Sequence, residues 1–496
     1  SYPEEMRTIA TDFYRNLLTT KNWTSVREQN RQKVWKCIQP KITSEMRDKL
    51  RARLTMTEVF DAIKALPAHS CAGEDSITMD FFKNYWEVIE QQLCGAFQEI
   101  LDIGQLSLEF GEGRIYLIPK TEGPTDEIKK WRPIILTIVY KILAKVLTAR
   151  IEPLLPQIIH TSQAGFIKEW SILDNIFTFW EATTQTIKTK KNLEILLLDF
   201  EKASNILDWE FLQGTLKRFG FEDGWVRSIS TLYRTTTSRV LLVGDKGPSF
   251  TLSRSVRQGC PLAPYSFLFF AEAMSLFLRK LEIGLKGLSI LTLKEEIVDV
   301  EFADNTALYL EGNVRNLKKA EEVIHCFYSA SRASINWNKT TGFQISEEDL
   351  PDWSTDSNFR LISKGEAIRY LGCQIGIGLS AEKQIAPLLL TIRRKLLFRS
   401  SAKLSLVGRA IIVNYVLLSS IWYILSCWIF SKSCINQIRR IVRSFLWSGK
   451  GEGSSRAKVA WTVITLPTPK GGLGIVDPVD QSRALLSKLV TKCGRS

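Results

Sequence analysis

The chain has 496 residues, of which 45% are hydrophobic and 24% charged, so it is globular and long enough for two or three subdomains. Its net charge of +14 favours a polyanionic partner, either nucleic acid or an acidic membrane surface. Nine cysteines form no C-x-x-C pair and three histidines are scattered, which excludes the usual zinc spacing and a disulfide framework. This cysteine usage predicts a reducing, intracellular compartment.

The first hundred residues predict helices. In "LTMTEVFDAIKALP", Thr55 and Glu58 have the spacing of a capping box, and Pro67 marks the end of the helix. Apolar residues then recur at helical spacing over 81–104.

The next segments predict strands mixed with helices. "EGRIYLIPK" (112–120) is typical of a short strand, and residues 131–156 predict a helix that begins at Pro133. "LEILLLDF" is a continuous apolar run that ends in Asp199, the pattern of a strand buried on both faces. A helix is expected to follow over 208–221.

The stretch "VDVEFADNTALYLEG" (298–312) predicts a hairpin with Asp304-Asn305 at its tip, because both residues tolerate the positive φ of tight turns. A plain turn explains this stretch by itself. The alternative is that Asp304 binds a metal ion together with a partner elsewhere in the chain. A helix over 316–331 is expected next.

Helical, basic sequence dominates from about residue 380. Residues 383–451 contain twelve Lys or Arg and no Asp or Glu. A solvated helix face usually mixes both signs, so this stretch predicts a groove that faces phosphates. Residues 346–358 are polar and predict a surface loop.

An uncharged run at 410–430 is long enough to cross a bilayer. Because it contains Asn414 and several serines between basic flanks, it predicts a buried amphipathic or core helix instead. The N-terminus has no cleavable signal pattern. The chain begins without Met and stops in "TKCGRS", which indicates a fragment.

Asp199 and Asp304 are the candidate metal ligands. Strand ends and hairpin tips can bring distant side chains together rigidly, so these two carboxylates are able to share a Mg²⁺ pair. Such a pair clamps an in-line phosphoryl displacement, where a triphosphate would otherwise repel the attacking oxygen.

Ordered motifs along the chain resemble the reverse transcriptase of non-LTR (LINE-type) retrotransposons, particularly those abundant in plants. In chain order the matching stretches are "RIYLIPK", "WRPIILTIVYKILAKVLTARI", "SQAGF", "SILDNI", "LLLDFEKA", "RQGCPLAPYSFLF", "FADN", "INWNKT", "YLG", "LSLVGRAIIVNYVLLSSIWY", "IRRIVRSFLWSG" and "KGGLGIVDP". The likeness covers nearly the whole chain, and the joint order of these motifs is highly specific.

The resemblance implies an α+β right-hand polymerase fold with fingers, a palm built on an antiparallel sheet, and a helical thumb. The implied divisions are a helical N-terminal extension with the start of the fingers (1–105), fingers (106–190), palm (191–376), and a basic helical thumb with the C-terminal segment (377–496).

The implied activity is RNA-directed DNA polymerisation, in which a DNA primer is extended on an RNA template by two-metal phosphoryl transfer. Two Mg²⁺ ions, replaceable by Mn²⁺, are the implied cofactors. RNA template, DNA primer and dNTPs are the implied partners, with other element-encoded proteins as further candidates and no membrane. The implied location is the nucleus or the cytoplasm.

The resemblance assigns roles to individual residues. Asp199 and Asp304 match the metal-binding carboxylates, followed by Asn305, and the Phe200 carbonyl is a candidate backbone ligand. Lys120 and Arg132 match finger residues that grip the incoming triphosphate.

Further matches surround the nucleotide. Gln258 and Gly259 match the loop that supports nucleotide and template, where glycine allows a close approach of the backbone. Lys339 matches the position proposed to protonate leaving pyrophosphate, although a solvated lysine explains it equally. "YLG" (370–372) resembles the primer-grip hairpin, and the acid-free stretch resembles the thumb that holds duplex by its phosphates.

The chain departs from the family pattern at the metal site and the nucleotide site. Asn305 stands where a second aspartate is expected, so metal affinity should fall without vanishing. Ser204 and Asn205 replace an aromatic residue and an aspartate. Because the aromatic residue acts as a steric gate against the ribose 2′-hydroxyl, we expect poor discrimination between rNTPs and dNTPs, which primer extension with rNTPs would test.

Other departures follow. Glu169-Trp170 replace an expected Gly-Arg, residues 70–77 lack the expected Pro and Gly, and Arg332-Ala333 replace an expected Gly-Leu. Together they indicate a decaying element copy whose fold survives better than its activity. A catalytically inactive nucleic-acid-binding remnant is therefore the alternative to an active polymerase, and a membrane protein anchored through 410–430 is a third reading that the palm motifs oppose.

Overall fold

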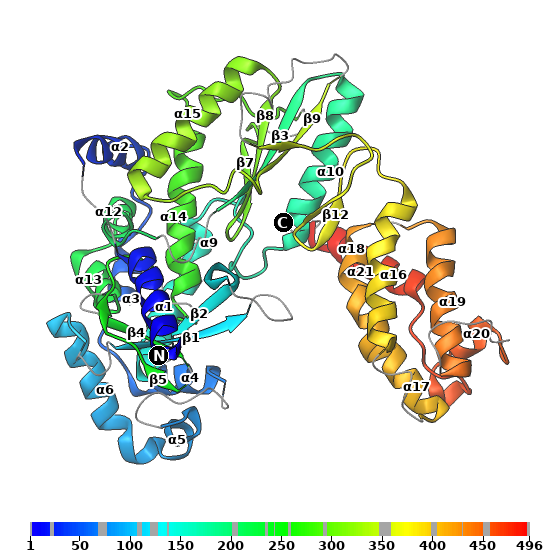
Figure 1. The fold of residues 1–496 in the computed structure, drawn as a ribbon, viewed down its shortest axis with the longest axis horizontal. Coiled ribbons are helices and arrows are strands. Elements are labelled where there is room, and N and C mark those ends of the chain that lie inside the picture. Colours follow the sequence, from blue (N-terminus) through cyan, green and yellow to red (C-terminus); the bar gives the residue numbers. More distant parts are fainter. Residues whose placement is uncertain are drawn as a thin grey trace. The chain divides into compact units, whose positions relative to one another are not determined.

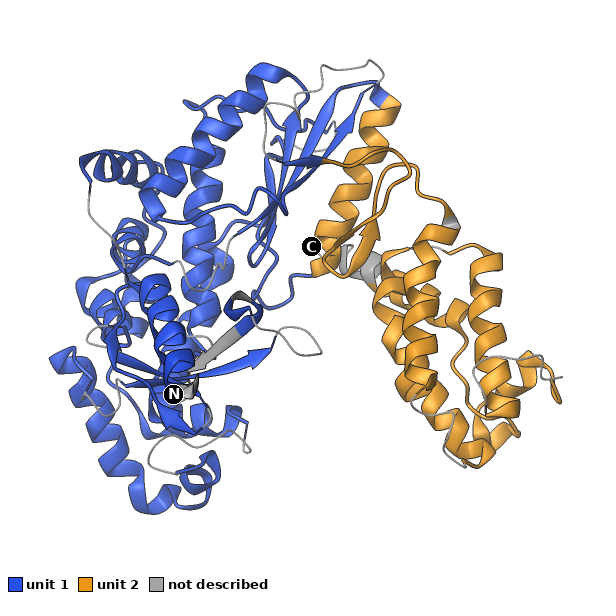
Figure 2. Ribbon diagram, in the orientation of Figure 1, with its two compact units in different colours: residues 1–171, 189–360 blue, residues 172–188, 361–496 orange. Residues whose placement is uncertain are grey.

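The computed structural model has two compact units (Figure 2). Unit 1 consists of residues 1–171 and 189–360, and unit 2 of residues 172–188 and 361–496. The structure describes residues 2–19, 24–67, 77–106, 112–119, 127–135, 138–200, 207–233, 237–242, 244–255, 259–290, 295–346, 359–397, 404–428, 430–449 and 457–493.

Unit 1 begins with helices, as the sequence predicted (Figure 1). They are α1 (Tyr2–Leu18), α2 (Ser25–Trp35), α3 (Ser44–Arg51), α4 (Met56–Ala65), α5 (Met79–Asn84) and α6 (Trp86–Ile103). The capping box of α4 is present, since Glu58 N donates to Thr55 Oγ1 (3.2 Å) and Thr55 N donates to Glu58 Oε2 (3.0 Å). Local side-chain chemistry therefore fixes the start of this helix.

A first sheet carries the predicted strand at 112–120. Its order is β2-β1-β4-β5, with β6 also paired to β4. The strands are β1 (Gly113–Pro119), β2 (Trp131–Ile135), β4 (Thr237–Leu242), β5 (Asp245–Lys246) and β6 (Phe250–Thr251).

The predicted helix start at Pro133 is wrong. Pro133 lies in strand β2, opposite Leu117, and helix α8 (Ile138–Ile151) begins only afterwards. Because β2 is an edge strand, a residue without an N–H can lie there without breaking the ladder. A single-turn η1 (Ile128–Lys130) precedes β2, and η2 (Glu152–Leu154) and α9 (Leu155–Ile158) follow α8.

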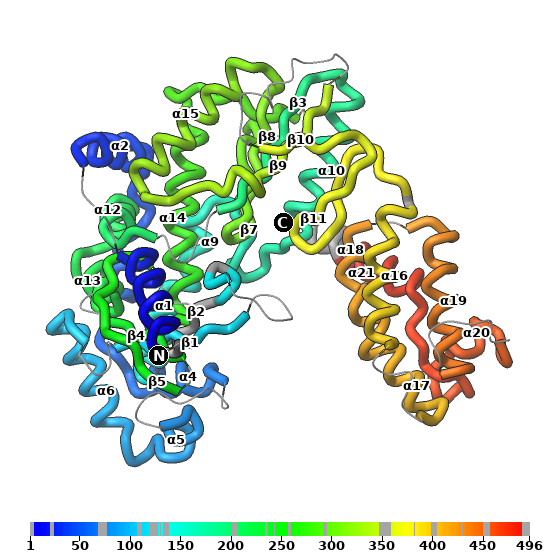
Figure 3. The backbone as a smooth tube through the Cα atoms, in the orientation of Figure 1, coloured from blue at the N-terminus to red at the C-terminus, as the bar shows by residue number. Residues whose placement is uncertain are grey.

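The second sheet has the order β10-β9-β3-β8-β7 and joins segments far apart in the sequence (Figure 3). Its strands are β3 (Leu193–Asp199), β7 (Asp299–Phe302), β8 (Asn305–Glu311), β9 (Thr341–Ile345) and β10 (Arg360–Leu361). The apolar run of β3 occupies the centre and is buried up to Leu198, as predicted. The ladder pairs of β3 are antiparallel on both sides.

Four further helices of unit 1 are α12 (Trp209–Phe219), α13 (Asp223–Thr231), α14 (Ala263–Leu278) and α15 (Val314–Ser331). Helices α14 and α15 pack against the strands of this sheet, and α12 packs against α14. The helices expected over 208–221 and 316–331 correspond to α12 and α15. α14 is apolar around most of its circumference because it is buried along nearly its whole length.

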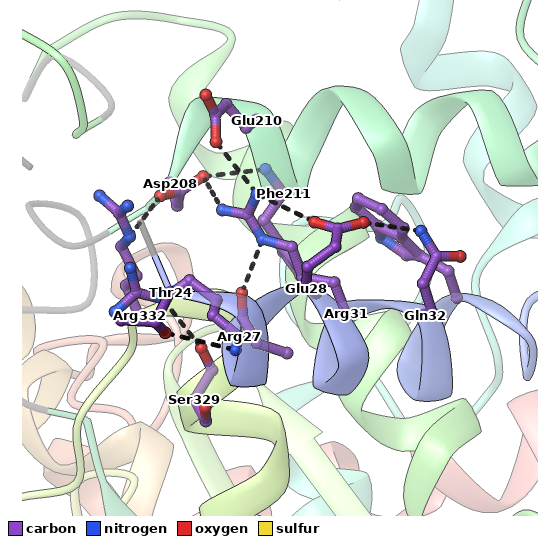
Figure 4. A network of polar contacts seen from close by, with 12 residues as sticks. Thr24, Arg27, Glu28, Arg31, Gln32, Asp208, Glu210, Phe211, Ser329 and Arg332 are labelled. Atoms are coloured by element: carbon purple, nitrogen blue, oxygen red, sulfur yellow. Dashed lines mark hydrogen bonds and ion pairs between the residues drawn. The ribbon is translucent and has the colours of Figure 1, made fainter. Parts of the chain in front are cut away.

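Helix α2 is tied to α12 and to the end of α15 by a buried ion network (Figure 4). Arg31, 3% exposed, bonds Asp208 Oδ1 and Glu210 Oε2, both at 3.0 Å, and donates Nε to the Ala330 carbonyl at the end of α15 (3.1 Å). Arg332 Nε lies 3.1 Å from Asp208 Oδ2. One buried carboxylate thus joins α2, α12 and the end of α15.

Unit 2 is mainly helical, as expected for the region after about residue 380. Its elements are α10 (Ile172–Thr189, assigned to this unit through Lys188), β11 (Ile368–Tyr370), β12 (Cys373–Ile375), α16 (Ala381–Leu397), α17 (Leu406–Ile412), η4 (Val413–Leu418), η5 (Ser419–Ile421), α18 (Trp422–Cys427), α19 (Lys432–Ser448), α20 (Trp461–Ile464), η6 (Thr468–Lys470) and α21 (Pro478–Cys493). Its apolar core combines α16, η4, α18 and α19.

Most of the uncharged run, through Cys427, lies in a continuous helical stretch, Leu406–Cys427, which is long and apolar enough to cross a membrane by length and composition. Within the unit, 44% of its apolar window is buried. Val413, Leu417 and Leu425 are fully buried in the core, whereas Tyr415 is 78% exposed. The stretch is therefore amphipathic and supplies one face of the core of unit 2, as predicted.

Candidate active site

Two neighbouring strands bring the candidate carboxylates together within unit 1. Asp199 is the last residue of β3 and pairs in register with Asn305, the first residue of β8. Asp304 directly precedes Asn305, in the turn between β7 and β8. Residues paired across an antiparallel ladder have Cα atoms about 4.5–5.5 Å apart. Both carboxylates therefore lie at the same end of the strands of the second sheet, although 105 positions separate them in the sequence.

The turn differs by one residue from the sequence prediction. Phe302 pairs with Asn305, so the two turn residues are Ala303 and Asp304, and Asn305 already belongs to β8. Ala303 takes the positive φ, +55°, in place of Asp304 or Asn305. Asp304 remains at the hairpin tip, as the prediction required.

The negative charge of Asp199 and Asp304 at this end of the strands favours a bound cation. Although the Asp304 side chain reaches the surface, the protein atoms around it raise its pKa by desolvation, and the negative charge of Asp199 raises that pKa further. A divalent cation beside Asp304 would offset this repulsion and favour the ionised form of its carboxyl.

Asn305 supports Asp304 in a way that a second aspartate would not. Its Nδ2 donates to Asp304 Oδ1 at 3.3 Å. An aspartate at this position would instead repel the neighbouring carboxylate. The amide keeps one oxygen that could contact a metal, with one negative charge fewer.

The oxygen donors fit a divalent metal ion that is shared with substrate phosphates. Among the described residues, no group of three His, Cys, Asp or Glu side chains gathers as a closed metal site. Asp199 and Asp304 supply two carboxylates instead, with the Asn305 amide oxygen and the Phe200 carbonyl as nearby candidates. Mg²⁺ is commonly held by one or two carboxylates, waters and phosphates, so this open set suits it.

The "INWNKT" segment fixes the end of β3. Asn336 N donates to the Asp199 carbonyl at 2.8 Å, and Asp199 N donates to Thr340 Oγ1 at 3.4 Å. Lys339 Nζ lies 3.7 Å from Asp199 Oδ2, with side chains 70% and 43% exposed. An ion pair this exposed contributes little stability, so Lys339 can turn toward a substrate.

Phe200 anchors Asp199 from the other side. Its ring is 6% exposed, and its centroid lies 6.2 Å from those of Phe267, Phe270 and Tyr328. Its backbone is bridged to Ile335. The position of Asp199 is thus set by the aromatic core of unit 1.

The remaining predicted residues are only partly described. Gly259 is exposed and has φ +95°, a conformation that glycine adopts without strain. Arg132 lies in β2 opposite Ile118, and its side chain is outside the described part. Lys120, Ser204 and Gln258 lie outside the described residues altogether.

A cluster of buried polar and charged side chains next to the hairpin was not predicted from the sequence. Asp299 and Glu301, both on β7, are fully buried. Arg279 Nε donates to Asp299 Oδ1 (2.7 Å), and Arg279 Nη1 lies 2.7 Å from Nδ1 of the His160 ring. Burial and the Arg279 charge lower the His160 pKa, which favours the neutral ring that accepts this bond. The alternating pattern offered no signal for this burial, because Asp299 and Glu301 occupy its polar positions, which normally face solvent.

Comparison with known proteins agrees with this geometry. The family model described as "Reverse transcriptase (RNA-dependent DNA polymerase)" matches residues 118–375, which include both carboxylates and the hairpin. The chain is 30% identical over 485 residues to the "Transposon TX1 uncharacterized 149 kDa protein" of Xenopus laevis, covering 96% of this chain and 35% of that protein.

Two further relatives are described as "Retrovirus-related Pol polyprotein from type-1 retrotransposable element R2". The protein of Nasonia vitripennis is 28% identical over 254 residues, 51% of this chain and 24% of the relative. That of Popillia japonica is 26% identical over 239 residues, 47% of this chain and 32% of the relative. The chain therefore spans about a third or less of the length of these relatives. Because the family model covers more than half of the chain, the chain belongs to the reverse transcriptase family, in the branch of non-LTR retrotransposons.

Proposed function

We propose that this chain is an RNA-directed DNA polymerase that extends a DNA primer on an RNA template with dNTPs. The observation that carries the proposal is the register of β3 and β8, which places Asp199 next to the Asp304-Asn305 pair. The two carboxylates are the groups that would hold two Mg²⁺ ions, or Mn²⁺. Bound there, the ions lower the repulsion between the primer 3′-oxygen and the triphosphate and stabilise the leaving pyrophosphate.

The residues of the chain supply binding, orientation and a proton. Asp199 is held by the backbone bond from Asn336 and by the buried Phe200, so its carboxylate is preorganised. Lys339, beside Asp199, is placed to donate a proton to departing pyrophosphate. Gly259 lets the backbone approach the nucleotide closely. Arg132 and Lys120 would neutralise the triphosphate from the fingers.

The alternative is a nucleic-acid-binding protein of the same fold without activity. Asn305 favours this alternative, because it removes one of the charges that hold metal. In both cases the basic stretch 383–451 supports a polyanionic partner. The cysteine usage of the sequence supports a reducing compartment, the nucleus or the cytoplasm.

Extension of a DNA primer annealed to RNA decides between these functions. We expect Mg²⁺-dependent extension by the chain and none by Asp199→Ala, with both proteins binding the duplex within about twofold of each other. Duplex binding without extension in either Mg²⁺ or Mn²⁺ would establish the binding protein instead. Extension by Asp199→Ala equal to that of the unchanged chain would contradict the assigned site.

A further inference from the structure

A short segment next to the catalytic hairpin, residues 162–165, contacts the turn that carries Asp304. We call this segment the brace. It forms a parallel bridge to β7 at Glu301, because Glu301 N donates to the Ser162 carbonyl (2.7 Å) and Ala164 N donates to the Glu301 carbonyl (2.8 Å). Since β7 is the last strand of the palm sheet, the brace covers its open edge.

Within the brace, the Gln163 side chain bonds the backbone of the catalytic turn. Gln163 is fully buried, and its Oε1 accepts from Ala303 N at 2.9 Å. Its Nε2 is 3.4 Å from the Ala303 carbonyl oxygen, to which it donates. One amide therefore contacts both polar groups of the residue immediately before Asp304, the residue that takes φ +55°.

The same amide is itself held from two sides. Gln163 Nε2 donates to Glu301 Oε2 at 2.9 Å, and Gly165 N donates to Gln163 Oε1 at 2.9 Å. A side chain at Gly165 would collide with the turn, because its Cβ would lie 2.4 Å from Ala303 N. These bonds fix the orientation of the Gln163 amide. The turn at Ala303 packs directly against the backbone of Gly165.

The chain just before the brace is anchored to α14. His160 N donates to Glu272 Oε2 at 2.9 Å, and Glu272 Oε1 lies 3.0 Å from Lys41 Nζ. Ser162 Oγ bonds Asp299 Oδ2 at 3.4 Å without touching the turn. The brace therefore connects the catalytic turn to the buried helix of unit 1.

We propose that Gln163 is a positioning residue: it holds Ala303 in its left-handed conformation and thereby orients the Asp304 carboxylate for the divalent cation. A non-glycine residue at positive φ costs about 1 kcal/mol or more and persists only where its surroundings enforce it. Here the enforcing groups are the amide of Gln163 and the bare backbone of Gly165. The proposal rests on the proposed function only for its effect on polymerisation, and not for its effect on the turn.

The test uses Gln163→Met, which keeps the side-chain length and removes the hydrogen bonds. Ser162→Ala is the matched control, since its side chain lies in the brace but does not touch the turn. For Gln163→Met we expect about tenfold faster amide hydrogen exchange in the peptide that contains Ala303–Asn305, and about tenfold weaker Mn²⁺ binding by electron paramagnetic resonance. For Ser162→Ala we expect both values within about twofold of the unchanged chain.

Exchanging the side-chain groups of positions 163 and 301 distinguishes a hydrogen-bonding role of Gln163 from a role in packing alone. Gln163→Glu removes the amide donor to Glu301 and to the Ala303 carbonyl and should loosen the turn as Gln163→Met does. Adding Glu301→Gln restores an amide–carboxyl bond with donor and acceptor reversed, while the carboxylate introduced at position 163 still accepts from Ala303 N. We expect the double variant to recover turn exchange and Mn²⁺ affinity to within about threefold, which a packing role would not produce.

If the unchanged chain extends primers, Gln163→Met should lower kcat about tenfold and leave the KM for dNTP within about threefold. If it does not extend them, the proposed function fails, and the hydrogen-exchange measurement still decides the role of Gln163.

Amide hydrogen exchange of the turn that stays within about twofold of the unchanged chain in Gln163→Met overturns the inference. Should Gln163→Met fail to fold by circular dichroism, Gly165→Ala takes its place, because its Cβ displaces the same turn; normal turn exchange in that variant would overturn the inference as well.

Discussion

At the scale of single residues, Asn305 is the departure that bears most directly on chemistry. Its amide donates to Asp304, so it stabilises the ionised carboxylate in the absence of metal. Asn305→Asp removes this bond and adds a charge. We expect Mn²⁺ affinity to rise about tenfold, because ligand charge tunes divalent-cation affinity, and metal-free thermal stability to fall slightly. Mn²⁺ titration checks this, with Asn305→Ala as a control that should bind more weakly than either; an Asn305→Asp variant that binds no more tightly than the unchanged chain would refute it.

Glu301 makes stability depend on pH. Burial raises the pKa of its carboxyl well above the ordinary value, Asp299 and Glu272 raise it further, and Arg279 lowers it. A raised folded-state pKa means that the folded chain keeps a proton that the unfolded chain releases above about pH 4.5. The contribution of Glu301 to stability is therefore fully present below that pH and is lost as pH rises toward its folded pKa.

Glu301→Gln should remove this dependence while keeping an acceptor for Gln163. We expect its free energy of unfolding, relative to that of the unchanged chain, to be higher at pH 8 than at pH 5. Urea denaturation at both pH values measures it. The exposed Glu322→Gln serves as the control, and an equal difference at both pH values would show that Glu301 is not the titrating group.

At the scale of elements, the Arg332-Ala333 departure has a structural explanation. Arg332 ends α15 with φ +62°, the conformation that glycine adopts most easily, and its N–H donates to the Tyr328 carbonyl at 2.8 Å. Its guanidinium also pairs with buried Asp208. Compared with the glycine expected at this position, Arg332 therefore adds backbone strain to the end of α15 but gains an ion pair. Decay of the sequence alone does not explain this substitution.

The same network predicts unequal costs for its members. Arg31→Met removes one of the two arginines that pair with the buried Asp208 carboxylate and leaves Arg332, so we expect a loss of about 3–5 kcal/mol in the free energy of unfolding. Arg332→Gly removes strain together with one ion pair, so its change should stay within about 1 kcal/mol. Glu210→Ala removes a partner that is 69% exposed and should also cost less than about 1 kcal/mol. Denaturant unfolding ranks the three variants, and a small effect of Arg31→Met would contradict the network.

At the scale of the whole molecule, the uneven charge predicts how the chain binds nucleic acid. The acid-free stretch includes Arg393 and Arg394, both on α16. If they contact phosphates, changing both to Gln should weaken binding of an RNA–DNA duplex and make the slope of log affinity against log salt shallower by about 1 per residue. Fluorescence anisotropy over a salt series measures both quantities. Lys49→Gln with Lys64→Gln changes net charge equally in unit 1, and an identical effect of that pair would show that net charge alone is responsible.

Much of the fold was predictable from the sequence because its signals are local. The capping box started α4, the apolar run of β3 predicted a central strand, and the alternation around Asp304 predicted a hairpin. Pro133 misled, because a proline that begins a helix and a proline on an edge strand look alike until the neighbouring strand is known. The division into units also follows packing, since α10 joins unit 2 although its sequence neighbours belong to unit 1.

The sequence by itself determined the family and the pair Asp199 and Asp304, because ordered motifs are written in residue identity and spacing. Only the tertiary structure decided that Ala303 takes the positive φ, that Asn305 bonds Asp304, and that Gln163 holds the turn. The bond from Ala303 to Gln163 joins a strand end to a loop 140 residues away in sequence. No local pattern encodes such a contact, because it exists only once the register of β3, β7 and β8 is set.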